Sequence, residues 1–340
     1  MGLASPSAVT GPSHGPDSKP LRIWAVSDGR AGIANQAIGL AEAVAALRPA
    51  VIETKQVAWK GRLGRLPALL NPFPRRGLLP QSAIEPPWPD LWIAAGRATL
   101  PLSIRMRRWS RRATFVVQIQ DPRLPLGLFD VVVPPRHDRL DGDNVVSITG
   151  SPHRVTAARL EAEYAPFAPL LDPLPRPRVA VLIGGKSKAF NLSPARAAAM
   201  AHEIQAPLEQ EGGSLMMSFS RRTPDDAKAL LTARLRDMPG VIWDGAGPNP
   251  YFAYLAAADY ILVTEDSANM AAEAASTGKP VFIMAMDGDH LKFRALHEDL
   301  ERQGAARPFG GAFHGFSYEP LRETERAAAE VLARMDARAS

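Results

Sequence analysis

The chain of 340 residues contains no cysteine, so neither a disulfide framework nor a thiolate metal site can form. A chain without thiols is typical of a reducing compartment, and we expect a cytoplasmic protein. Long apolar runs are also missing, because none approaches the roughly 18 residues that a membrane-spanning helix needs. Residues 1–20 lack the apolar core of a signal peptide and are rich in glycine, serine and proline, which predicts a disordered tail.

The chain does have enough apolar bulk for two domains, since 46% of its residues are hydrophobic. Prolines crowd residues 166–177, a composition typical of a stiff linker. We therefore predict a first domain at residues 21–165 and a second domain at residues 178–318. A closing helical segment follows at residues 319–340.

Short apolar runs alternate with helical patterns along both predicted domains. Such runs predict buried strands, and the helices between them predict parallel sheets and an α/β fold. We expect strands at residues 21–27, 51–57, 91–95, 115–120, 131–133 and 145–149 of the first domain, and at residues 179–183, 215–218, 241–243, 261–263 and 280–283 of the second.

Basic residues concentrate in the first domain. Residues 21–155 carry 19 Lys and Arg against 10 Asp and Glu, whereas residues 156–340 carry 20 against 24. In residues 60–80 and 105–112 the basic residues alternate with apolar ones, which suits an anionic membrane surface. Peripheral association with the inner face of a membrane is therefore one interpretation. A solvated basic face is the simpler one, and nucleic acid is the less favoured partner.

Residues 258–284 carry the strongest functional signal. An apolar strand leads to Asp266 and Ser267, a helix follows, and Gly278 closes that helix before the next strand. A helix N-terminus at the carboxyl edge of a parallel sheet suits a phosphate. Glu273, two turns into the helix, is placed to accept hydrogen bonds from the hydroxyls of a sugar. In the alternative interpretation, Asp266 and Ser267 only cap the helix and Glu273 is a surface charge.

Two further loops that follow predicted strands have the composition of phosphate ligands. Glycines allow close backbone approach, and serine and lysine supply a hydroxyl and a positive charge. The spacing of a Walker A loop is absent. Paired arginines at a strand end predict a diphosphate between them, although one of the two could be solvated. The predicted ligands in these loops are Gly184, Gly185, Lys186, Ser187 and Lys188 in the first, and Ser220, Arg221 and Arg222 in the second.

Several blocks of the sequence together resemble the mitochondrial fission ELM-type family, whose bacterial members are regarded as GT-B glycosyltransferases. The blocks occur in family order over nearly the whole chain after residue 20. They are SDGRAGIANQ at 27–36, GGKSKAFNL at 184–192, SFSRRTP at 218–224, NPY at 249–251, TEDSANMAAEAASTGKPV at 264–281 and QGAARPF at 303–309.

The resemblance implies two doubly wound Rossmann-like domains that face each other across a cleft. It also implies that the closing helix packs back on the first domain. In this arrangement the nucleotide-sugar donor binds the second domain, with Asn249 and Tyr251 near the nucleotide base. A pair of lobes of the periplasmic-binding type is the alternative fold, but no secretion signal supports it.

In a GT-B enzyme the loop after the first strand faces the acceptor. Asp28 and Asp121, which both follow predicted strands, are therefore candidates for the general base, with turn chemistry as the alternative role of Asp28. His153 is a weaker acid or base candidate, because a histidine beside proline is more often structural. The residues that we expect on the acceptor side are Gly29, Arg30, Asn35, Gln36 and Arg97.

These features predict sugar transfer from a nucleoside diphosphate donor to a lipid-linked or envelope-associated acceptor. The Asp-Gly-Asp strings at 141–143 and 287–289 have the composition of surface turns, so we predict no metal and no cofactor besides the donor. The alternative function is a non-catalytic scaffold, because the family takes its name from organelle fission. A scaffold has no need to retain Asp266, Ser267 and Glu273 together.

Overall fold

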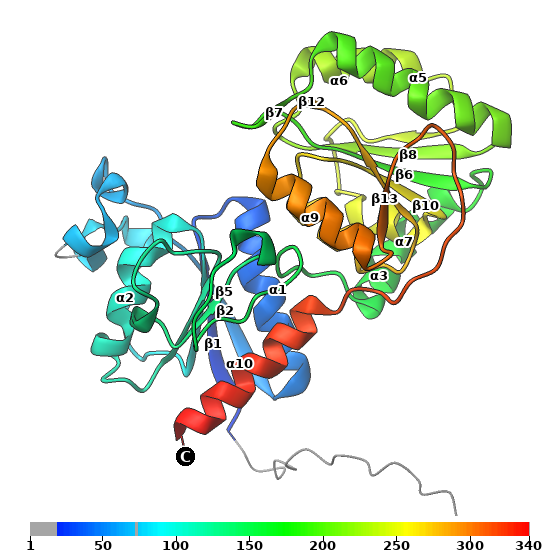
Figure 1. Cartoon of the computed structure of the whole chain (residues 1–340). Coiled ribbons are helices and arrows are strands. Elements are labelled where there is room, and N and C mark those ends of the chain that lie inside the picture. The colour runs from blue at the N-terminus through cyan, green and yellow to red at the C-terminus, as the bar shows by residue number, and fades with distance from the viewer. Residues whose placement is uncertain (1–18, 72–73, 340) are drawn as a thin grey trace, which may run out of the picture.

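The computed structural model describes residues 19–71 and 74–339, which fold into two lobes (Figure 1). Each lobe contains one parallel sheet with helices on both faces, so the predicted α/β class is confirmed. The tail predicted at residues 1–20 lies outside the described residues, apart from Lys19 and Pro20. We refer to the N-terminal and C-terminal lobes as the N-lobe and the C-lobe.

The N-lobe is built on five parallel strands in the order β2-β1-β3-β4-β5. Strands β3 and β4 are buried along their whole length because helices cover both faces of the sheet. Helices α1 and α10 cover one face, and α2 covers the other. The bounds are β1 Leu21–Ser27, β2 Ala50–Gln56, β3 Leu91–Ala95, β4 Phe115–Ile119, β5 Val131–Val133, α1 Ala31–Leu47, α2 Leu100–Trp109 and α10 Glu323–Ala339.

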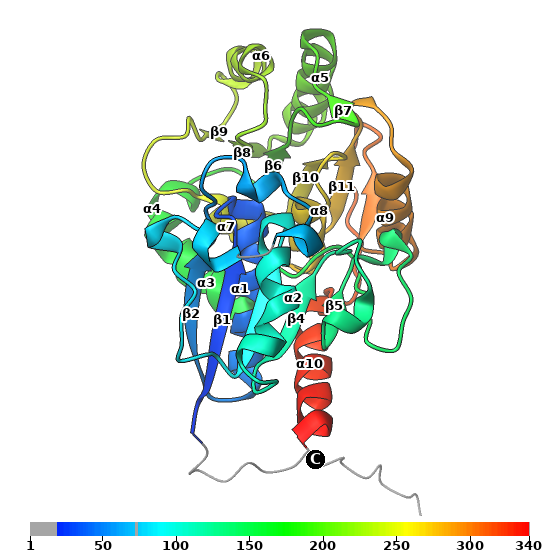
Figure 2. The same ribbon diagram turned by 90° about the vertical axis from the view of Figure 1, so that its left-hand side faces the viewer.

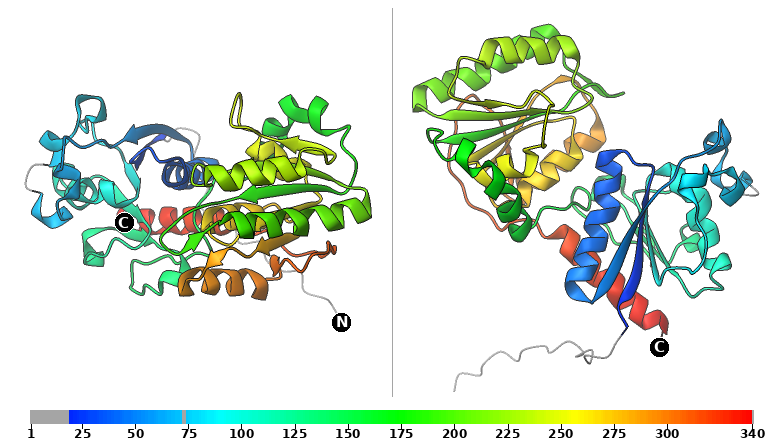
Figure 3. Two further views of the ribbon diagram at one scale, coloured as in Figure 1. Left: turned by 90° about the horizontal axis from the view of Figure 1, so that it is seen from above. Right: turned by 180° about the vertical axis from the view of Figure 1, so that it is seen from behind.

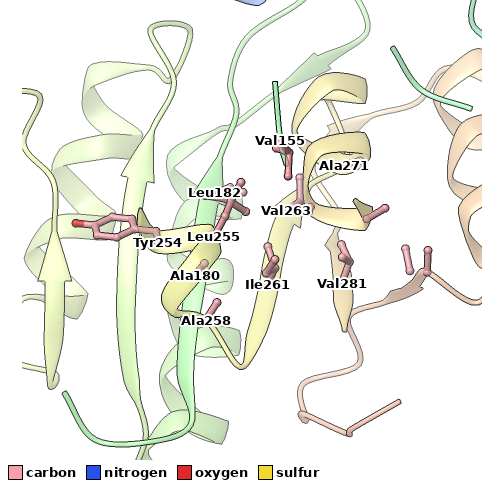
Figure 4. Close-up of a cluster of buried hydrophobic side chains, with 14 of the residues drawn as sticks. Val155, Ala180, Leu182, Tyr254, Leu255, Ala258, Ile261, Val263, Ala271 and Val281 are labelled. Carbon is pink, nitrogen blue, oxygen red and sulfur yellow. The ribbon is translucent and has the colours of Figure 1, made fainter. Parts of the chain in front are cut away.

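The C-lobe has six parallel strands in the order β13-β11-β10-β6-β8-β9. Helices α5 and α6 cover one face, while α7, α8 and α9 cover the other, where Ile261 and Val263 pack with Leu182 and Ala271 (Figure 4). The bounds are β6 Arg178–Ile183, β8 Ser214–Phe219, β9 Gly240–Ile242, β10 Tyr260–Thr264, β11 Val281–Met284, β13 Ala306–Pro308, α5 Pro194–Glu211, α6 Asp225–Leu235, α7 Tyr251–Ala257, α8 Ala268–Ala275 and α9 Leu291–Arg302.

Short elements complete the described chain. Strands β7 and β12 pair antiparallel, so Asp287 lies in a strand and not in the surface turn that the sequence predicted. Its carboxylate accepts a hydrogen bond of 2.8 Å from the Ser193 N–H. These elements are β7 Phe190–Asn191, β12 Asp287–Gly288, α3 Ala157–Tyr164, α4 Ala168–Leu171 and the 3-10 helices η1 Leu63–Arg65, η2 Ala68–Leu70, η3 Pro74–Gly77, η4 Pro80–Ser82, η5 Arg97–Thr99, η6 Leu126–Leu128, η7 Arg136–Asp138 and η8 Ala165–Phe167.

The strand order in each lobe reverses direction once, which is the mark of a doubly wound sheet. The reversal lies between β1 and β3 in the N-lobe and between β6 and β10 in the C-lobe. In such sheets ligands bind outside the carboxyl ends of the strands at this switch point. The loops after β1, β3, β6 and β10 are therefore the places to look for a site.

The chain crosses between the lobes earlier than the sequence predicted. The prediction placed residues 155–164 in the first domain and a linker at 166–177, but Leu160 and Tyr164 pack against the C-lobe core, and Leu171 is fully buried in it. The crossing therefore lies before α3. The chain then returns at its end, where α10 lies against α1 on the N-lobe sheet (Figures 1 and 3).

Among the described residues, no helix combines the length and the apolar character that crossing a bilayer requires.

The docking of α10 gives a test of the fold. Val331 is fully buried in the N-lobe core, so Val331→Asp places an unpaired carboxylate there. We expect the free energy of unfolding, measured by urea denaturation, to fall by about 3 to 5 kcal/mol. The matched control is Ala329→Asp on the exposed face of the same helix. A similar loss of stability in both variants would contradict the packing of α10 against the sheet.

Candidate functional site

A fully buried carboxylate, Asp266, organises the carboxyl edge of the C-lobe sheet. Its Oδ2 accepts hydrogen bonds from the Gly185 N–H at 3.0 Å and from the Arg222 guanidinium at 2.8 Å. Its Oδ1 accepts a hydrogen bond of 2.8 Å from the Thr264 hydroxyl. The sequence predicted that Asp266 binds the nucleotide-sugar donor directly. Its hydrogen-bond partners show instead that Asp266 connects the three loops after β6, β8 and β10.

The glycine loop after β6 approaches these neighbours too closely for any side chain. A Cβ atom at Gly184 would lie 1.9 Å from Asp266 Oδ1, and one at Gly185 would lie 2.1 Å from the Arg222 carbonyl oxygen. The Lys186 N–H donates to that same carbonyl at 2.9 Å. The loop is therefore fixed against the turn after β8, as a rigid ligand site requires.

Three predicted ligands at this edge are exposed cations, namely Lys186, Lys188 and Arg221. Arg222, the second member of the predicted arginine pair, instead forms an ion pair with Asp266, although its side chain is 45% exposed. The hydroxyls of Ser187 and Ser220 accept hydrogen bonds from backbone N–H groups within their own loops. The structure thus leaves exposed positive charge at the edge, while the two serines shape their loops.

Helix α8 begins as predicted, with Ser267 Oγ accepting a hydrogen bond of 3.3 Å from the Met270 N–H. The next two residues, Ala268 and Asn269, line a cavity between the lobes. First-turn N–H groups have no partner within their own helix, and the dipole is positive at this end. Figure 2 shows α8 where the two lobes meet. The cavity therefore has an anion-favouring wall on its C-lobe side.

Glu273 is buried in the C-lobe and accepts a hydrogen bond of 2.5 Å from the Tyr251 hydroxyl. Burial raises the pKa of Glu273 to about 7, and the tyrosine hydrogen bond lowers it in part. Asn249 Oδ1 accepts a hydrogen bond of 3.0 Å from the Tyr251 N–H at the start of α7. Glu273, the predicted ribose ligand, thus contacts Tyr251, and Tyr251 contacts Asn249; the last two are the predicted base ligands. The ribose hydroxyls of a nucleotide therefore have to share the Glu273 carboxylate with the Tyr251 hydroxyl.

On the N-lobe edge, Asp28 forms an ion pair of 2.8 Å with the exposed Arg30. Gly29 has a φ of +80°, which favours glycine, and the Gln56 side chain fills the space that a Cβ atom would need. Asn35 is half-buried on α1. Asp28 is therefore held in its own loop by a salt bridge, which makes it the less available of the two base candidates.

Asp121, the second base candidate, lies in the wall of the cavity between the lobes, which has a volume of about 260 Å³. Its Oδ1 accepts a hydrogen bond of 2.8 Å from the Arg123 N–H in a tight turn. Arg97 and Gln36, both predicted on the acceptor side, line the same cavity. The cavity thus joins Gln36 of α1 and residues from the carboxyl ends of β3, β4 and β5 of the N-lobe to the first turn of α8 in the C-lobe.

A chain of amide hydrogen bonds joins the lobes beside this cavity. Gln120 donates to Gln36 at 3.0 Å, and Gln36 donates to Asn269 at 3.1 Å. Asn269 also accepts a hydrogen bond of 2.6 Å from the Ser151 hydroxyl and donates to the Gly32 carbonyl at 3.2 Å. The N-terminus of α8 is therefore held by the loop and helix that follow β1.

His153 lies in the contact between the lobes and does not line this cavity. Its Nδ1 accepts a hydrogen bond from the Val155 N–H at 3.2 Å, and its Nε2 lies 2.8 Å from the hydroxyl of Ser276, the C-cap of α8. Burial lowers the pKa of His153 to about 4, so the ring is neutral near pH 7. This geometry supports the structural role for His153.

Sequence reasoning missed several residues of the cavity. His137 and Asp138 come from η7, and Lys292 of α9 forms an ion pair with Asp138 across the lobes. The buried Gln118 of β4 also lines the cavity. The pattern HD four residues after the strand at 131–133 was a usable signal. By contrast, nothing in the sequence pairs Lys292 with Asp138.

These two lobes, each with a doubly wound parallel sheet and with a cavity between their carboxyl edges, define the GT-B fold. Solved structures agree. MurG from Acinetobacter baumannii superposes with a TM-score of 0.50 over 92% of this chain and 100% of its own, at 13% identity. The UDP-GlcNAc 2-epimerase from Methanocaldococcus jannaschii gives 0.50 over 91% and 92%, at 11% identity.

The chain belongs to the family described as Mitochondrial fission ELM1, which matches residues 31–335. It is 32% identical over 287 residues to the mitochondrial fission protein ELM1 of Arabidopsis thaliana, covering 76% of this chain and 67% of the plant protein. It is also 29% identical to the uncharacterized protein RP120 of Rickettsia prowazekii, over 91% and 97% of the two chains. The resemblance stated from the sequence blocks is thereby confirmed.

The buried pair of Glu273 and Tyr251 predicts a pH-dependent stability. The folded-state pKa of about 7 lies above the ordinary glutamate pKa of 4.5, so stability present below pH 4.5 is lost as the pH rises through 7. Glu273→Gln cannot ionise. We expect this variant to match the wild type at pH 4.5 and to be more stable at pH 8, by roughly 3 kcal/mol from the linkage relation.

Urea denaturation at several pH values measures this difference. Tyr251→Phe is the companion variant, because it removes the hydrogen bond that lowers the Glu273 pKa and should steepen the pH dependence. A stability difference between Glu273→Gln and wild type that does not change between pH 4.5 and 8 would show that Glu273 titrates normally.

Proposed function

We propose that this protein is a glycosyltransferase that moves a sugar from a nucleoside diphosphate donor to an acceptor hydroxyl. One observation carries the proposal: a single cavity has the N-terminus of α8 on one wall and the Asp121 carboxylate on the other. A phosphate suits the first wall, and a general base suits the second. GT-B enzymes act between two lobes in this way.

In the proposed complex the donor diphosphate lies at the first turn of α8. The exposed Lys186, Lys188 and Arg221 at the same sheet edge add positive charge, and Glu273 accepts hydrogen bonds from the ribose hydroxyls. Positive charge and the helix dipole stabilise the leaving diphosphate, so we propose transfer without a metal. UDP-GlcNAc is the first donor to test, because solved proteins of this fold include UDP-GlcNAc 2-epimerases.

In the proposed reaction, Asp121 accepts the proton of the acceptor hydroxyl as its oxygen attacks the anomeric carbon. The bond from that carbon to the diphosphate oxygen breaks, and the diphosphate leaves with the electron pair. Asp121 is preferred to Asp28 as the base because Asp121 lines the cavity, whereas Asp28 is paired with Arg30.

The rival function is a non-catalytic scaffold that keeps the fold. A scaffold has no need of a nucleotide site, so nucleotide binding separates the two functions. The thermal-shift assay suits this question, because a ligand that binds only the folded state raises the melting temperature.

We expect at least one of the UDP, GDP, ADP, CDP or TDP conjugates to raise the melting temperature. At pH 8, above the Glu273 pKa of about 7, Glu273→Gln should weaken that binding about tenfold or more, since hydrogen bonds to a charged group contribute about 1.5 to 3 kcal/mol each. Asp121→Asn should keep the shift but lose transfer. The matched control is Glu161→Gln, an exposed carboxylate on α3. No response of the wild type to any conjugate would favour the scaffold.

We further propose that the acceptor is lipid-linked or envelope-associated and that the N-lobe binds an anionic membrane surface. Four leucines of the loop between β2 and β3 are exposed, from 39% for Leu63 to 71% for Leu70. Exposed basic residues of the same loop accompany them, among them Lys60 and Arg62. Arg105 holds the loop in place by donating to the Asn71 carbonyl, so it serves as an anchor. Phe73, which belongs to the same stretch of basic and apolar residues at 60–80, lies outside the described residues.

Co-sedimentation with vesicles of phosphatidylserine and phosphatidylcholine tests this surface. We expect Leu69→Ser combined with Leu70→Ser to reduce the bound fraction severalfold, since each buried leucine contributes about 1.5 to 3 kcal/mol. The control is Leu170→Ser, a 50% exposed leucine of α4. Equal binding of the double variant and the control, or binding without phosphatidylserine, would argue against the proposal.

A further inference from the structure

The cavity between the lobes contains polar groups that the proposed proton transfer does not use. Its N-lobe wall includes Gln118 on β4, Arg97 after β3 and Arg123 after β4. These three side chains come from the carboxyl ends of β3 and β4 in the N-lobe sheet, opposite the donor edge of the C-lobe. The hydrogen bonds and the charge that these side chains lack therefore indicate which chemical groups the acceptor substrate carries.

The Gln118 side chain has a hydrogen-bond acceptor without a donor. The residue is 1% exposed, and its Nε2 donates to the Ile119 carbonyl at 3.2 Å. Its Oε1 is buried and has no hydrogen-bond partner among the described residues. A buried carbonyl oxygen without a hydrogen-bond donor is unfavourable, so the site favours a ligand that brings a hydroxyl or amide N–H.

Arg97 and Arg123 supply unpaired positive charge. Both side chains are exposed at the cavity, and within the described chain neither guanidinium forms an ion pair with a carboxylate. The other cation of the wall, Lys292, is already paired with Asp138. Arg97 also lies just before α2, whose N-terminus is the positive end of its dipole. Arginine forks match the oxygens of a phosphate, so this wall favours an anionic ligand group.

We propose that this wall binds an acceptor that carries both hydroxyl groups and a phosphate, such as a sugar phosphate or a phosphoinositol head group. Gln118 Oε1 accepts a hydrogen bond from a ligand hydroxyl, and Arg97 and Arg123 bind the phosphate. The role of this ligand as the acceptor rests on the proposed glycosyl transfer. Binding of the ligand to the wall does not depend on a donor. The same chemistry occurs in a free sugar phosphate and in a lipid head group.

Isothermal titration calorimetry tests binding without requiring turnover. The probes are glucose 1-phosphate, glucose 6-phosphate, inositol 1-phosphate, glucose and inorganic phosphate, titrated into the full chain. We expect a phosphorylated polyol to bind at least tenfold more tightly than glucose. Arg97→Ala and Arg123→Ala should each weaken that binding about tenfold. Gln118→Met should weaken binding of the sugar phosphate but not of inorganic phosphate. Arg108→Ala, an exposed arginine on α2, is the matched control.

A second arm distinguishes the two sources of the phosphate. Vesicles containing phosphatidylinositol should bind less well to Arg97→Ala if the lipid head group enters the cavity. Soluble inositol 1-phosphate should then compete with the vesicles. If only the soluble probes respond to Arg97→Ala, the acceptor is a free sugar phosphate.

Three results would overturn the proposal. The first is that none of the phosphorylated probes binds at millimolar concentration, and the second is that glucose binds as tightly as they do. The third is that the arginine variants weaken binding of the nucleotide instead, which would assign this wall to the donor. Failure of the proposed function has a different signature, because nucleotide binding would be absent while a sugar phosphate still binds through Arg97 and Gln118.

Discussion

The buried carboxylate of Asp266 is the interaction on which the C-lobe edge depends. A charge removed from water is tolerated only when hydrogen bonds and an opposite charge replace its hydration. Here the Gly185 N–H, the Thr264 hydroxyl and the Arg222 guanidinium supply that replacement. Because these groups come from the ends of β6, β10 and β8, one side chain fixes three loops at the carboxyl edge of the sheet. It also fixes where α8 begins, one residue later at its N-cap.

The short helix α8 then connects the lobes through three separate faces. Ala271, Ala274 and Ala275 pack in the C-lobe core. Asn269, Ala272 and Ser276 face the N-lobe, where they meet Gln36, the backbone near Gly150, and His153. The third face carries Glu273 toward Tyr251. A ligand that binds the first turn of α8 therefore contacts an element already held by both lobes, and its position relative to the N-lobe wall is fixed in advance.

The sequence was sufficient for the features that depend on local pattern. Ten of the eleven predicted strands correspond to strands of the two sheets, because strands covered on both faces appear as short apolar runs bounded by turns. The exception, residues 145–149, forms only isolated bridges to β5 and to Pro135. Helix α9 was missed, although the spacing of Leu296 and Leu300 on one face is a helical signal.

Features that depend on long-range pairing could not be predicted. The ion pair of Lys292 with Asp138 and the hydrogen bond of Gln36 with Asn269 join residues far apart in the chain. The place where the chain crosses between the lobes could not be predicted from the sequence either, because α3 has the same amphipathic pattern whichever lobe it covers. Leu160 and Tyr164 settle that question only through their contacts with the C-lobe.

The balance between stability and function is most visible at Glu273. A buried glutamate whose pKa rises to about 7 weakens the fold at neutral pH, and a glutamine or a methionine in its place would not. Its tyrosine partner recovers only part of that cost, since the hydrogen bond lowers the pKa less than burial raises it. Groups of this kind gather at functional sites, where a strong acceptor is needed inside the protein. Asp266 differs in this respect, because Arg222 neutralises it and the loops around it depend on its presence. The two carboxylates of this segment thus have different roles. Asp266, just before α8, holds the loops of the site in place, whereas Glu273, two turns later, does not stabilise the fold at neutral pH.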